Sequence, residues 1–352
     1  MRIRSRRAIL LLFVCFLALF LILPHFHVYL VDLKRLVRNQ GTTQNTKIPK
    51  SVEWINGEQR QDEIGKRFKD RIANVTRMCG LRGVDYKQNW ENVIKTGKFT
   101  GNFAASYFHR YLTCLVIKAG SSTWNNFMWK LRAPGEAKKY GFWIKMVNSN
   151  NEAWARLSGE KRIELSKDEN AVRLMNVRHP LARMISGWGD KFTKTVCYDM
   201  YFKRYPGMLD YPNKYGKWKG PKDGYFMEFA DFARYVADYG TKSITNLDVH
   251  FRPMLSHCDP CRYPFNYITK LETFYTDAKW IAAKLNSSLD AITHENVINK
   301  SKDPAAVIKE HFSKVEPDVV ERLLQFFKDD METFGYTFNK TTLMAGGWEK
   351  EP

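Results

Sequence analysis

The fold of this chain is predicted from two stretches of similar design, Leu112-Thr-Cys-Leu-Val-Ile-Lys118-Ala-Gly-Ser-Ser-Thr-Trp124 and Leu174-Met-Asn-Val-Arg178-His-Pro-Leu-Ala-Arg183-Met-Ile-Ser186. Each reads as an apolar strand that ends at a cation, Lys118 or Arg178, and turns directly into a helix. Such a turn points free backbone N–H groups and a fixed positive charge at one place, which suits a phosphate group. Two of these turns predict a ligand that is phosphorylated at both ends.

The residues after each cation have the spacing of a helix that packs on one face. After Lys118 the apolar residues recur at i, i+3, i+4 and i+7, and the helix is expected to end before Pro134. After Arg178, Pro180 suits the first helical position, and the same spacing follows. The two apolar faces consist of Trp124, Phe127, Met128 and Leu131, and of Leu181, Met184, Ile185 and Trp188.

The segments before the two cations, 112–117 and 172–177, are mostly apolar, as expected of parallel strands that are covered on both faces. Residues 267–272 are a further candidate strand, and helices are expected over 276–285 and 319–332. This alternation of strands and helices predicts an α/β fold with a mainly parallel sheet flanked by helices.

The chain is strongly basic. Its 352 residues carry 56 Lys and Arg against 37 Asp and Glu, a formal charge of +19. Four arginines lie within the first seven residues, so a large excess remains on the rest of the chain. This excess indicates an anionic partner, such as nucleic acid, an acidic membrane surface, an acidic polysaccharide or a polyphosphate ligand, although a merely soluble basic surface gives the same count.

The N-terminus predicts a membrane anchor. Residues 8–31 are almost entirely apolar, long enough to span a bilayer at about 20 residues, and basic residues 1–7 favour a cytoplasmic tail. A cleaved signal peptide is the alternative, but the region lacks a small-x-small cleavage site. An uncleaved signal anchor places the rest of the chain in a lumen, where it meets no nucleic acid.

Residues 32–102 are polar and read as a lumenal stem, with a possible short helix over 63–77. The globular body is expected over 103–352. Within it, 203–224 is rich in Gly, Pro, Lys and Tyr and is expected to be an irregular excursion.

Sequons and cysteines fit a lumenal body. Four segments match the N-glycosylation acceptor pattern, beginning at Asn74, Asn286, Asn299 and Asn339. Five cysteines follow the anchor, which permits two disulfides and one thiol with the connectivity open: Cys79, Cys114, Cys197, Cys258 and Cys261. Cys258 and Cys261 could form half of a zinc site, but no second Cys/His pair at ligand spacing accompanies them, which favours a disulfide role.

The small residues after Lys118 let the backbone approach a phosphate, and Lys118 adds a mobile charge. The contacts expected here are from Lys118, Ala119, Gly120, Ser121, Ser122 and Thr123. The order of lysine and glycine differs from the Walker pattern, and an ordinary strand–helix turn with serine caps is the alternative.

In the second stretch, the guanidinium of Arg178 offers a planar fork that suits a phosphate. Ser186 lies about two turns along the following helix, on the same side as its start. Arg183 is either a further phosphate contact or a solvated charge, and His179 is interpreted as a local structural hydrogen bonder.

These residues resemble the Golgi carbohydrate sulfotransferases, especially the branch of the chondroitin and dermatan 4-O-sulfotransferases. In that family a P-K-x-G/A-C/S-[ST]-x-W/F segment binds the 5′-phosphosulfate of PAPS (3′-phosphoadenosine 5′-phosphosulfate), and an R-x-P-x-x-R-x-x-S segment binds its 3′-phosphate. The segment from Lys118 to Trp124 is similar to the first, with Ile117 where proline is usual. The second is matched in full by Arg178, Pro180, Arg183 and Ser186.

A third block resembles H-W-x-P…C-x-P-C…Y-D-x-I-G-K-L-E-T of the same branch. It is matched by His250-Phe-Arg-Pro253, Cys258-Asp-Pro-Cys261 and Tyr267-Ile-Thr-Lys-Leu-Glu-Thr273, with Phe251, Asn266 and Thr269 as departures. The likeness spans about residues 110–285, and three ordered blocks are more specific than any one alone.

The resemblance implies a sulfotransferase fold and transfer of a sulfuryl group from PAPS, without a required metal, to a glycan hydroxyl, as in chondroitin or dermatan. It also implies a single-pass type II Golgi membrane protein with a lumenal catalytic domain. Lys118 is expected to stabilise the leaving group and His250 to act as the base; His109 and Glu272 are the alternative bases. The rival functions are a P-loop kinase and a catalytically inactive, membrane-anchored glycan-binding protein.

Overall fold

A computed structural model of the chain describes residues 57–84, 90–96, 103–132, 153–192, 204–209, 211, 227–287, 303–340 and 344–346. They belong to one compact unit, Gly57–Pro352. The expected tail, the expected anchor at 8–31 and most of the 203–224 excursion lie outside the described residues. Of the helices that are described, none has both the length and the apolar character needed to cross a bilayer.

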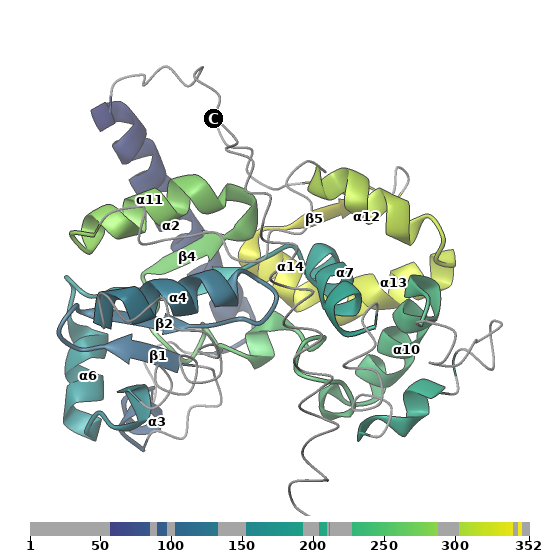
Figure 1. Cartoon of the computed structure of the whole chain (residues 1–352), viewed down its shortest axis with the longest axis horizontal. Helices are drawn as coiled ribbons and strands as arrows, with labels where there is room; N and C mark the ends of the chain where they lie inside the picture. Colours follow the sequence, from purple (N-terminus) through teal and green to yellow (C-terminus); the bar gives the residue numbers. More distant parts are fainter. Residues whose placement is uncertain are drawn as a thin grey trace, which may run out of the picture. The chain divides into compact units, whose positions relative to one another are not determined.

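A four-stranded sheet in the order β1-β2-β3-β4 lies in the left half of Figure 1, with helices beside it. The strands are β1 (Phe103–Ser106), β2 (Tyr111–Cys114), β3 (Val172–Val177) and β4 (Tyr267–Lys270). β2, β3 and β4 are parallel, and β1 pairs antiparallel with β2 through a tight turn. The prediction of a mainly parallel sheet is therefore confirmed, with an added antiparallel edge strand.

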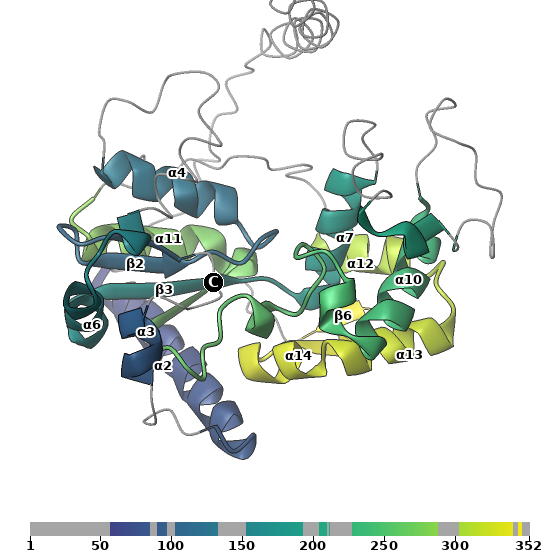
Figure 2. The ribbon, with the colours of Figure 1, turned by 90° about the horizontal axis from the view of Figure 1, so that it is seen from below.

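Helices cover both faces of the sheet (Figure 2). α4 (Ser121–Arg132) and α11 (Phe274–Lys284) pack on one face, where Trp124, Phe127 and Ile281 share a core with strand residue Leu174. α3 (Trp90–Thr96) and α6 (Gly159–Lys167) lie on the other face. Because β3 is buried on both sides, its apolar run has no polar alternation, as the sequence indicated.

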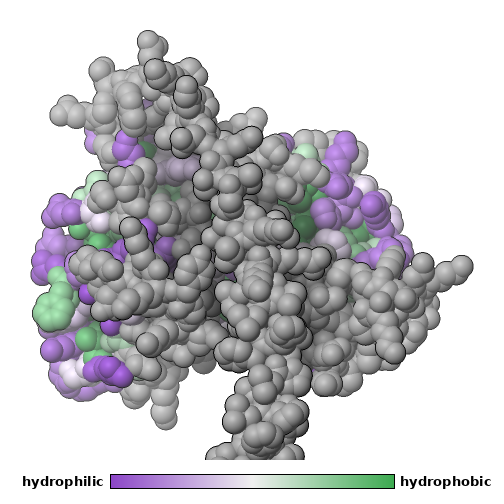
Figure 3. Space-filling model, in the orientation of Figure 1, coloured by the Kyte–Doolittle hydropathy of each residue, from purple (hydrophilic) through white to green (hydrophobic). Residues whose placement is uncertain are grey.

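A group of helices lies beyond the C-terminal end of the sheet (Figures 1 and 2). It comprises α7 (Pro180–Lys191), α10 (Phe229–Lys242), α12 (Pro304–Phe312), α13 (Pro317–Phe326) and α14 (Lys328–Phe334), followed by the hairpin of β5 (Thr337–Asn339) and β6 (Met344–Gly346). Aromatic rings fill the space between them, with Phe232 and Phe251 at 4.7 Å between centroids. The described surface visible in Figure 3 is mainly hydrophilic, with smaller hydrophobic areas between.

The single helix predicted over 319–332 is two helices in the structure, α13 and α14. The break falls at Phe327, whose backbone leaves the helical region with φ −97° and ψ 8°. Its side chain is buried and contacts Phe326 at 4.8 Å between ring centroids. The helix breaks where this ring is buried, and the sequence has no helix-breaking residue there. Periodicity alone therefore predicted one continuous helix.

α2 (Gly57–Leu81) packs against β4, α11 and α14, although the sequence analysis placed these residues in the stem. Arg71 of α2 is buried and donates to the Ile268 carbonyl at 2.7 Å and to Asp277 of α11 at 2.7 Å. A buried ion pair of this kind requires close packing, because each charge must be compensated locally. The packed body therefore extends N-terminally beyond residue 103.

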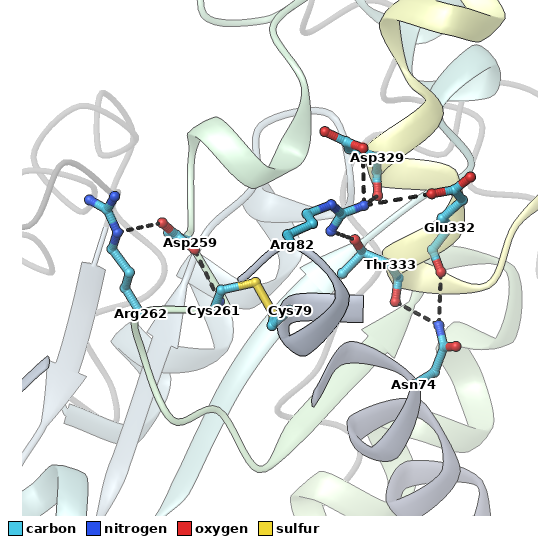
Figure 4. Close-up of a disulfide and its surroundings, with 9 residues drawn as sticks. All are labelled: Asn74, Cys79, Arg82, Asp259, Cys261, Arg262, Asp329, Glu332 and Thr333. Atoms are coloured by element: carbon cyan, nitrogen blue, oxygen red, sulfur yellow. Dashed lines mark hydrogen bonds and ion pairs between the residues drawn. A yellow bond between two sulfur atoms is a disulfide. The ribbon is translucent and has the colours of Figure 1, made fainter. Parts of the chain in front are cut away.

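Two disulfides tie distant segments together, and the cysteines of the C-x-x-C motif bond to different partners. Cys261 bonds to Cys79 of α2 (Figure 4), and Cys258 bonds to Cys114 at the end of β2. The disulfide role that was preferred over a zinc site is thus confirmed, and the connectivity that the sequence left open is assigned. The fifth cysteine, Cys197, lies outside the described residues.

The sequon at Asn74 lies inside α2 (Figure 4). The side-chain nitrogen of Asn74, the atom that would carry a glycan, donates to the carbonyls of Glu332 and Thr333 at 2.9 Å each. Asn286 and Asn339 are exposed, and Asn286 has φ +50°. Asn299 lies outside the described residues.

Replacing Cys79 and Cys261 together by serine is expected to lower the free energy of unfolding by about 2–5 kcal/mol, because the bond closes a long loop in the unfolded chain. Urea denaturation of the oxidised wild type and the double variant measures the difference. An unchanged midpoint in the double variant, or peptide mapping that finds Cys258 bonded to Cys261, would contradict this prediction.

Candidate active site

The two cation-tipped turns lie side by side at the C-terminal edge of the sheet. Since β2 and β3 are parallel neighbours, Lys118 and Arg178 leave the sheet at the same edge. The Arg178 guanidinium donates to the Lys118 carbonyl at 3.3 Å, which joins the two turns directly. Two segments about sixty residues apart in the sequence therefore face one place, as a single ligand with two phosphates requires.

The turn after β2 has an unusual backbone. Lys118 has φ +69° and Gly120 has φ +89°, both in the left-handed region. For Lys118 this conformation is strained, and strain at a non-glycine residue is typical of functional turns. A Cβ atom on Gly120 would lie 3.3 Å from Cδ1 of Leu271, so glycine suits this position for space as well as for φ. Because Gly120 has no side chain, the backbone of this turn is accessible to a ligand, whereas a larger residue would block that access.

The start of α4 presents hydrogen-bond donors to this edge. Trp124 is the first residue of the helix whose N–H reaches a backbone carbonyl, that of Gly120 at 3.2 Å. The preceding amides, those of residues 120–123, donate to no backbone carbonyl of the described residues. Neither the Ser121 nor the Ser122 hydroxyl has a hydrogen-bond partner in the described part of the chain. Together with the helix dipole, these groups form an anion site.

A buried asparagine that the sequence analysis missed holds this turn on the sheet. The Asn176 amide group donates to the carbonyls of Val116 at 3.1 Å and Ala119 at 2.7 Å, and it accepts from the Val116 N–H at 3.1 Å. Asn176 is 1% exposed, so these bonds form away from water. A polar residue within an apolar strand was the only signal in the sequence that pointed to it.

Asp190, near the end of α7, was also missed. Its carboxylate accepts a hydrogen bond from Lys118 Nζ and pairs with Lys191 Nζ at 3.1 Å. Burial would raise the pKa of Asp190, but the hydrogen bonds and charges of the two lysines hold it well below its ordinary range. Lys118 is therefore fixed by a carboxylate that remains ionised, and a polyanionic ligand would compete with that carboxylate for it.

His250 lies in the same region, in a histidine–aspartate pair. Its Nδ1 lies 2.5 Å from Oδ1 of Asp248, which also accepts the His250 backbone N–H at 2.9 Å, and Oδ2 of Asp248 accepts the Tyr205 hydroxyl at 3.2 Å. Burial lowers the pKa of His250, Asp248 opposes this, and the charges of Lys191 and Lys118 lower it further. The imidazole is thus neutral near pH 7, which a general base requires.

α7 approaches the His250 segment closely because Gly187 has no side chain. A Cβ atom there would lie 2.7 Å from Cε1 of Phe251, closer than packed atoms allow. Phe251 is fully buried, so it cannot move aside. This contact brings the helix that carries Ser186 and Asp190 against the segment that carries His250. Ser186 is partly exposed, and its hydroxyl has no partner among the described residues.

Around Arg178 lie groups from two further segments. Burial lowers the pKa of the Arg178 guanidinium, and the nearby charge of Glu272 opposes this. Glu272 accepts the His179 N–H at 2.8 Å and the Tyr336 hydroxyl at 2.9 Å, so both of its oxygens are engaged. Glu272 is therefore placed to balance Arg178 rather than to accept a proton from a substrate.

The other histidines are placed away from this chemistry. His179 caps α7 by accepting the Leu181 N–H at 3.3 Å, and burial lowers its pKa to about 4. This confirms its interpretation as a structural hydrogen bonder. His109 lies in the β1–β2 turn, bonded to Ser106 at 2.7 Å, at the opposite end of β2 from Lys118. Of the two candidate histidine bases, His250 is the one close enough to Lys118 for that charge to lower its pKa.

Arg183 is buried and is therefore not the solvated charge that the sequence analysis gave as one alternative. It is 1% exposed and donates to the Ile117 carbonyl at 2.8 Å, the Arg252 carbonyl at 2.6 Å and Nε2 of His257 at 3.0 Å. Burial lowers the pKa of Arg183 to about 10 and that of His257 to about 3, so the arginine is charged and the histidine accepts. Arg183 thus ties the Lys118 turn to the His250 segment from within the protein.

A family model described as "Sulfotransferase family" matches residues 102–337. The chain is 23% identical over 233 residues to carbohydrate sulfotransferase 11 of Danio rerio, and the match covers 65% of each chain. It is 26% identical over 245 residues to carbohydrate sulfotransferase 10 of Xenopus laevis, again covering 65% of each. Carbohydrate sulfotransferase 14 of Danio rerio is 21% identical over 77% of this chain and 72% of its own.

The chain thus spans slightly less than two thirds of the length of the first two relatives. No solved structure matches it. The matched region begins one residue before β1 and includes both cation-tipped turns, the His250 segment and the helices that follow them.

Replacing Arg183 by methionine is expected to lower the free energy of unfolding by about 3 kcal/mol or more, because buried carbonyls and His257 lose their donor. Arg262→Met is the matched control, because that arginine is exposed and forms one surface ion pair, with Asp259; its expected change is below about 1 kcal/mol. Urea denaturation measures both. Equal stability of the two variants would show that Arg183 is not the tether described here.

Proposed function

The chain belongs to the sulfotransferase family, and on this premise we propose that it transfers a sulfuryl group from PAPS to a hydroxyl of a glycan. The observation that carries the proposal is the adjacency of the Lys118 and Arg178 turns at one sheet edge. PAPS has a phosphosulfate at one end and a 3′-phosphate at the other, which is the pattern of ligand that two neighbouring anion sites suit.

The first turn would bind the 5′-phosphosulfate. The amides of residues 120–123 and the hydroxyls of Ser121, Ser122 and Thr123 surround the start of α4, and Lys118 adds a full charge. The second turn would bind the 3′-phosphate through Arg178 and the Ser186 hydroxyl. This division leaves Arg183 in a supporting role, since its donors are used within the protein.

The transfer itself requires three changes of bonding. The acceptor oxygen forms a bond to sulfur, the bond from sulfur to the bridging oxygen of the 5′-phosphate breaks, and the acceptor hydroxyl loses its proton. Lys118 and the amides at the start of α4 stabilise the negative charge that develops on the leaving phosphate. His250 accepts the proton at Nε2, while Asp248 holds Nδ1 and stabilises the imidazolium that forms.

Lys118 has two alternative partners in this mechanism, the Asp190 carboxylate and the leaving oxygen of the donor. Before the donor binds, Lys118 pairs with Asp190, and in the reaction its ammonium group follows the leaving oxygen. A compact, mobile ammonium suits this exchange better than a planar guanidinium does.

The acceptor that we propose is an acidic glycan such as chondroitin or dermatan. The large basic excess of the chain favours a polyanionic acceptor, and the relatives named above are carbohydrate sulfotransferases. The expected anchor at 8–31 would hold the enzyme in the Golgi membrane with its body in the lumen, where PAPS-dependent modification of proteoglycans would occur.

Incubation of the detergent-solubilised chain with ³⁵S-labelled PAPS and a panel of glycans tests this function. We expect label in an acidic glycan, and digestion into disaccharides identifies the sugar and the hydroxyl. A chain that binds these glycans but transfers no label to any of them would support the inactive glycan-binding protein instead.

Lys118→Ala is expected to lower kcat by about 10²–10³, because a preorganised charge at the leaving group is removed. Initial rates at saturating PAPS and acceptor measure the effect. Lys309→Ala, which removes an exposed lysine on α12, is the matched control and should behave like the wild type. Activity of Lys118→Ala within a few-fold of wild type would exclude the proposed role.

Arg178→Ala is expected to raise the KM for PAPS by at least about tenfold while changing kcat less, because one charge-assisted contact to the donor is lost. Donor titrations at saturating acceptor separate the two parameters. An unchanged KM for PAPS would contradict the assignment of Arg178 to the 3′-phosphate.

Activity is expected to fall as the pH drops through the pKa of His250, which lies below the ordinary histidine value. Asp248→Asn removes a charge that raises this pKa, so the acidic limb of the pH–rate profile should move to lower pH and kcat should fall. His250→Gln should remove that limb and lower kcat by about 10²–10⁴. His109→Gln, at the far end of β2, is the matched control. A wild-type profile in His250→Gln would exclude it as the base.

A further inference from the structure

A groove at the opposite end of β4 from the active-site edge combines aromatic rings with lysines. It lies between α2, α11 and the start of β4 and has a volume of about 970 Å³. We call it the aromatic–lysine groove and define it by six lining residues: Phe68, Tyr267, Trp280, Lys66, Lys69 and Lys284. β4 rises about 3.3 Å per residue, so its start at Tyr267 lies about 10 Å from Lys270 at the active-site edge.

The three rings form one aromatic cluster, in which the ring planes are tilted or edge-on to one another. The centroid distances are 5.3 Å for Phe68 and Tyr267, 5.1 Å for Phe68 and Trp280, and 5.0 Å for Tyr267 and Trp280. Phe68 is buried and forms the floor, whereas Tyr267 and Trp280 are partly exposed. Gly65 lies beside Trp280, where a Cβ atom would be 4.0 Å from the indole nitrogen, so a longer side chain at this position would extend over the ring.

Most polar groups of the groove are left for a ligand, and Lys284 already lies over the Trp280 ring, with Nζ 5.0 Å from the ring centroid. Lys66, Lys69 and Lys284 are exposed and form no ion pair with any described carboxylate. Within the same described part of the chain, the Trp280 indole N–H and the Tyr267 hydroxyl have no hydrogen-bond partner. Asp62 is the one acidic residue in the lining, so the groove has an excess of positive charge.

We propose that the aromatic–lysine groove is an accessory binding site for an extended, acidic polysaccharide. Pyranose rings present C–H groups that pack against the negative face of an aromatic ring, while sulfates and carboxylates along such a chain pair with lysines. A purely apolar ligand would leave the lysines unused, and a small anion would leave the rings uncovered. The choice of a glycan as the occupant rests on the proposed function.

The site would act by holding a long acceptor near the enzyme. When one part of a long glycan is bound in the groove, the effective concentration of its other sugars at the active-site edge increases. An acceptor that is too short to reach from the groove to the active site has no such increase in effective concentration. The groove therefore predicts a preference for long acceptors that arises outside the catalytic residues.

Binding of a fluorescent long-chain chondroitin sulfate to the full-length chain in detergent tests the site directly. Charge reversal of Lys66, Lys69 and Lys284 to glutamate is expected to weaken this binding at least about tenfold, because three ion pairs become repulsive. The matched control reverses Lys242, Lys309 and Lys314, three exposed lysines on the other helical group, and makes the same change in net charge. Equal losses in both triple variants would overturn the proposal.

A second pair of variants tests the ring surface without changing the charge. Gly65→Leu places a side chain over Trp280 and should weaken binding to a similar extent, whereas Gly65→Ala should not. Both replace a helical glycine by a better helix former, so neither is expected to unfold the protein. Binding of adenosine 3′,5′-bisphosphate should stay unchanged in all variants. Wild-type binding by Gly65→Leu would overturn the role of the rings.

Rates then separate this site from the proposed function. The groove variants should raise the KM for a long chondroitin acceptor at least about fivefold and leave that for a hexasaccharide unchanged. Equal effects on both acceptors would overturn the accessory site. A wild-type chain that transfers no sulfate, yet binds the long chain through the groove, would overturn the proposed function alone.

Discussion

The buried guanidinium of Arg183 connects the three parts of the site from inside the protein. It reaches the Ile117 carbonyl before the Lys118 turn and the Arg252 carbonyl beyond His250, while its own helix carries Ser186 and Asp190. A buried charge must be satisfied by several acceptors, so these segments cannot separate without leaving the charge unpaired. The fixed position of the donors at the sheet edge depends on this one group.

Three further restraints act on the same segments. Asn176 fixes the backbone on both sides of the Lys118 turn, and the Cys114–Cys258 bond joins the end of β2 to the segment that follows His250. Asp330 of α14 accepts the Met254 and Leu255 N–H groups, and burial raises its pKa to about 6. Restraints of this kind let Lys118 keep a left-handed backbone that is unfavourable on its own.

Each cation of the site has a carboxylate nearby that partly compensates its positive charge. Asp190 offsets Lys118 and Lys191, Glu272 offsets Arg178, and Asp248 orients His250. Each carboxylate meets a group that a polyanionic donor would also attract, so the residues are held in place before a ligand arrives. Electrostatic preorganisation of this kind lowers the cost of stabilising a charged transition state.

The sequence by itself determined the strands that end at Lys118 and Arg178, the helices that follow and the parallel sheet, because these depend on local periodicity and on turn residues close in the chain. It also indicated the site residues that follow a strand directly. Only the tertiary structure decided the packing of α2, the break at Phe327, the two disulfide pairings and the buried position of Arg183. Those features depend on contacts between residues far apart in the chain. Local residue spacing does not indicate which distant residues come into contact in the folded protein.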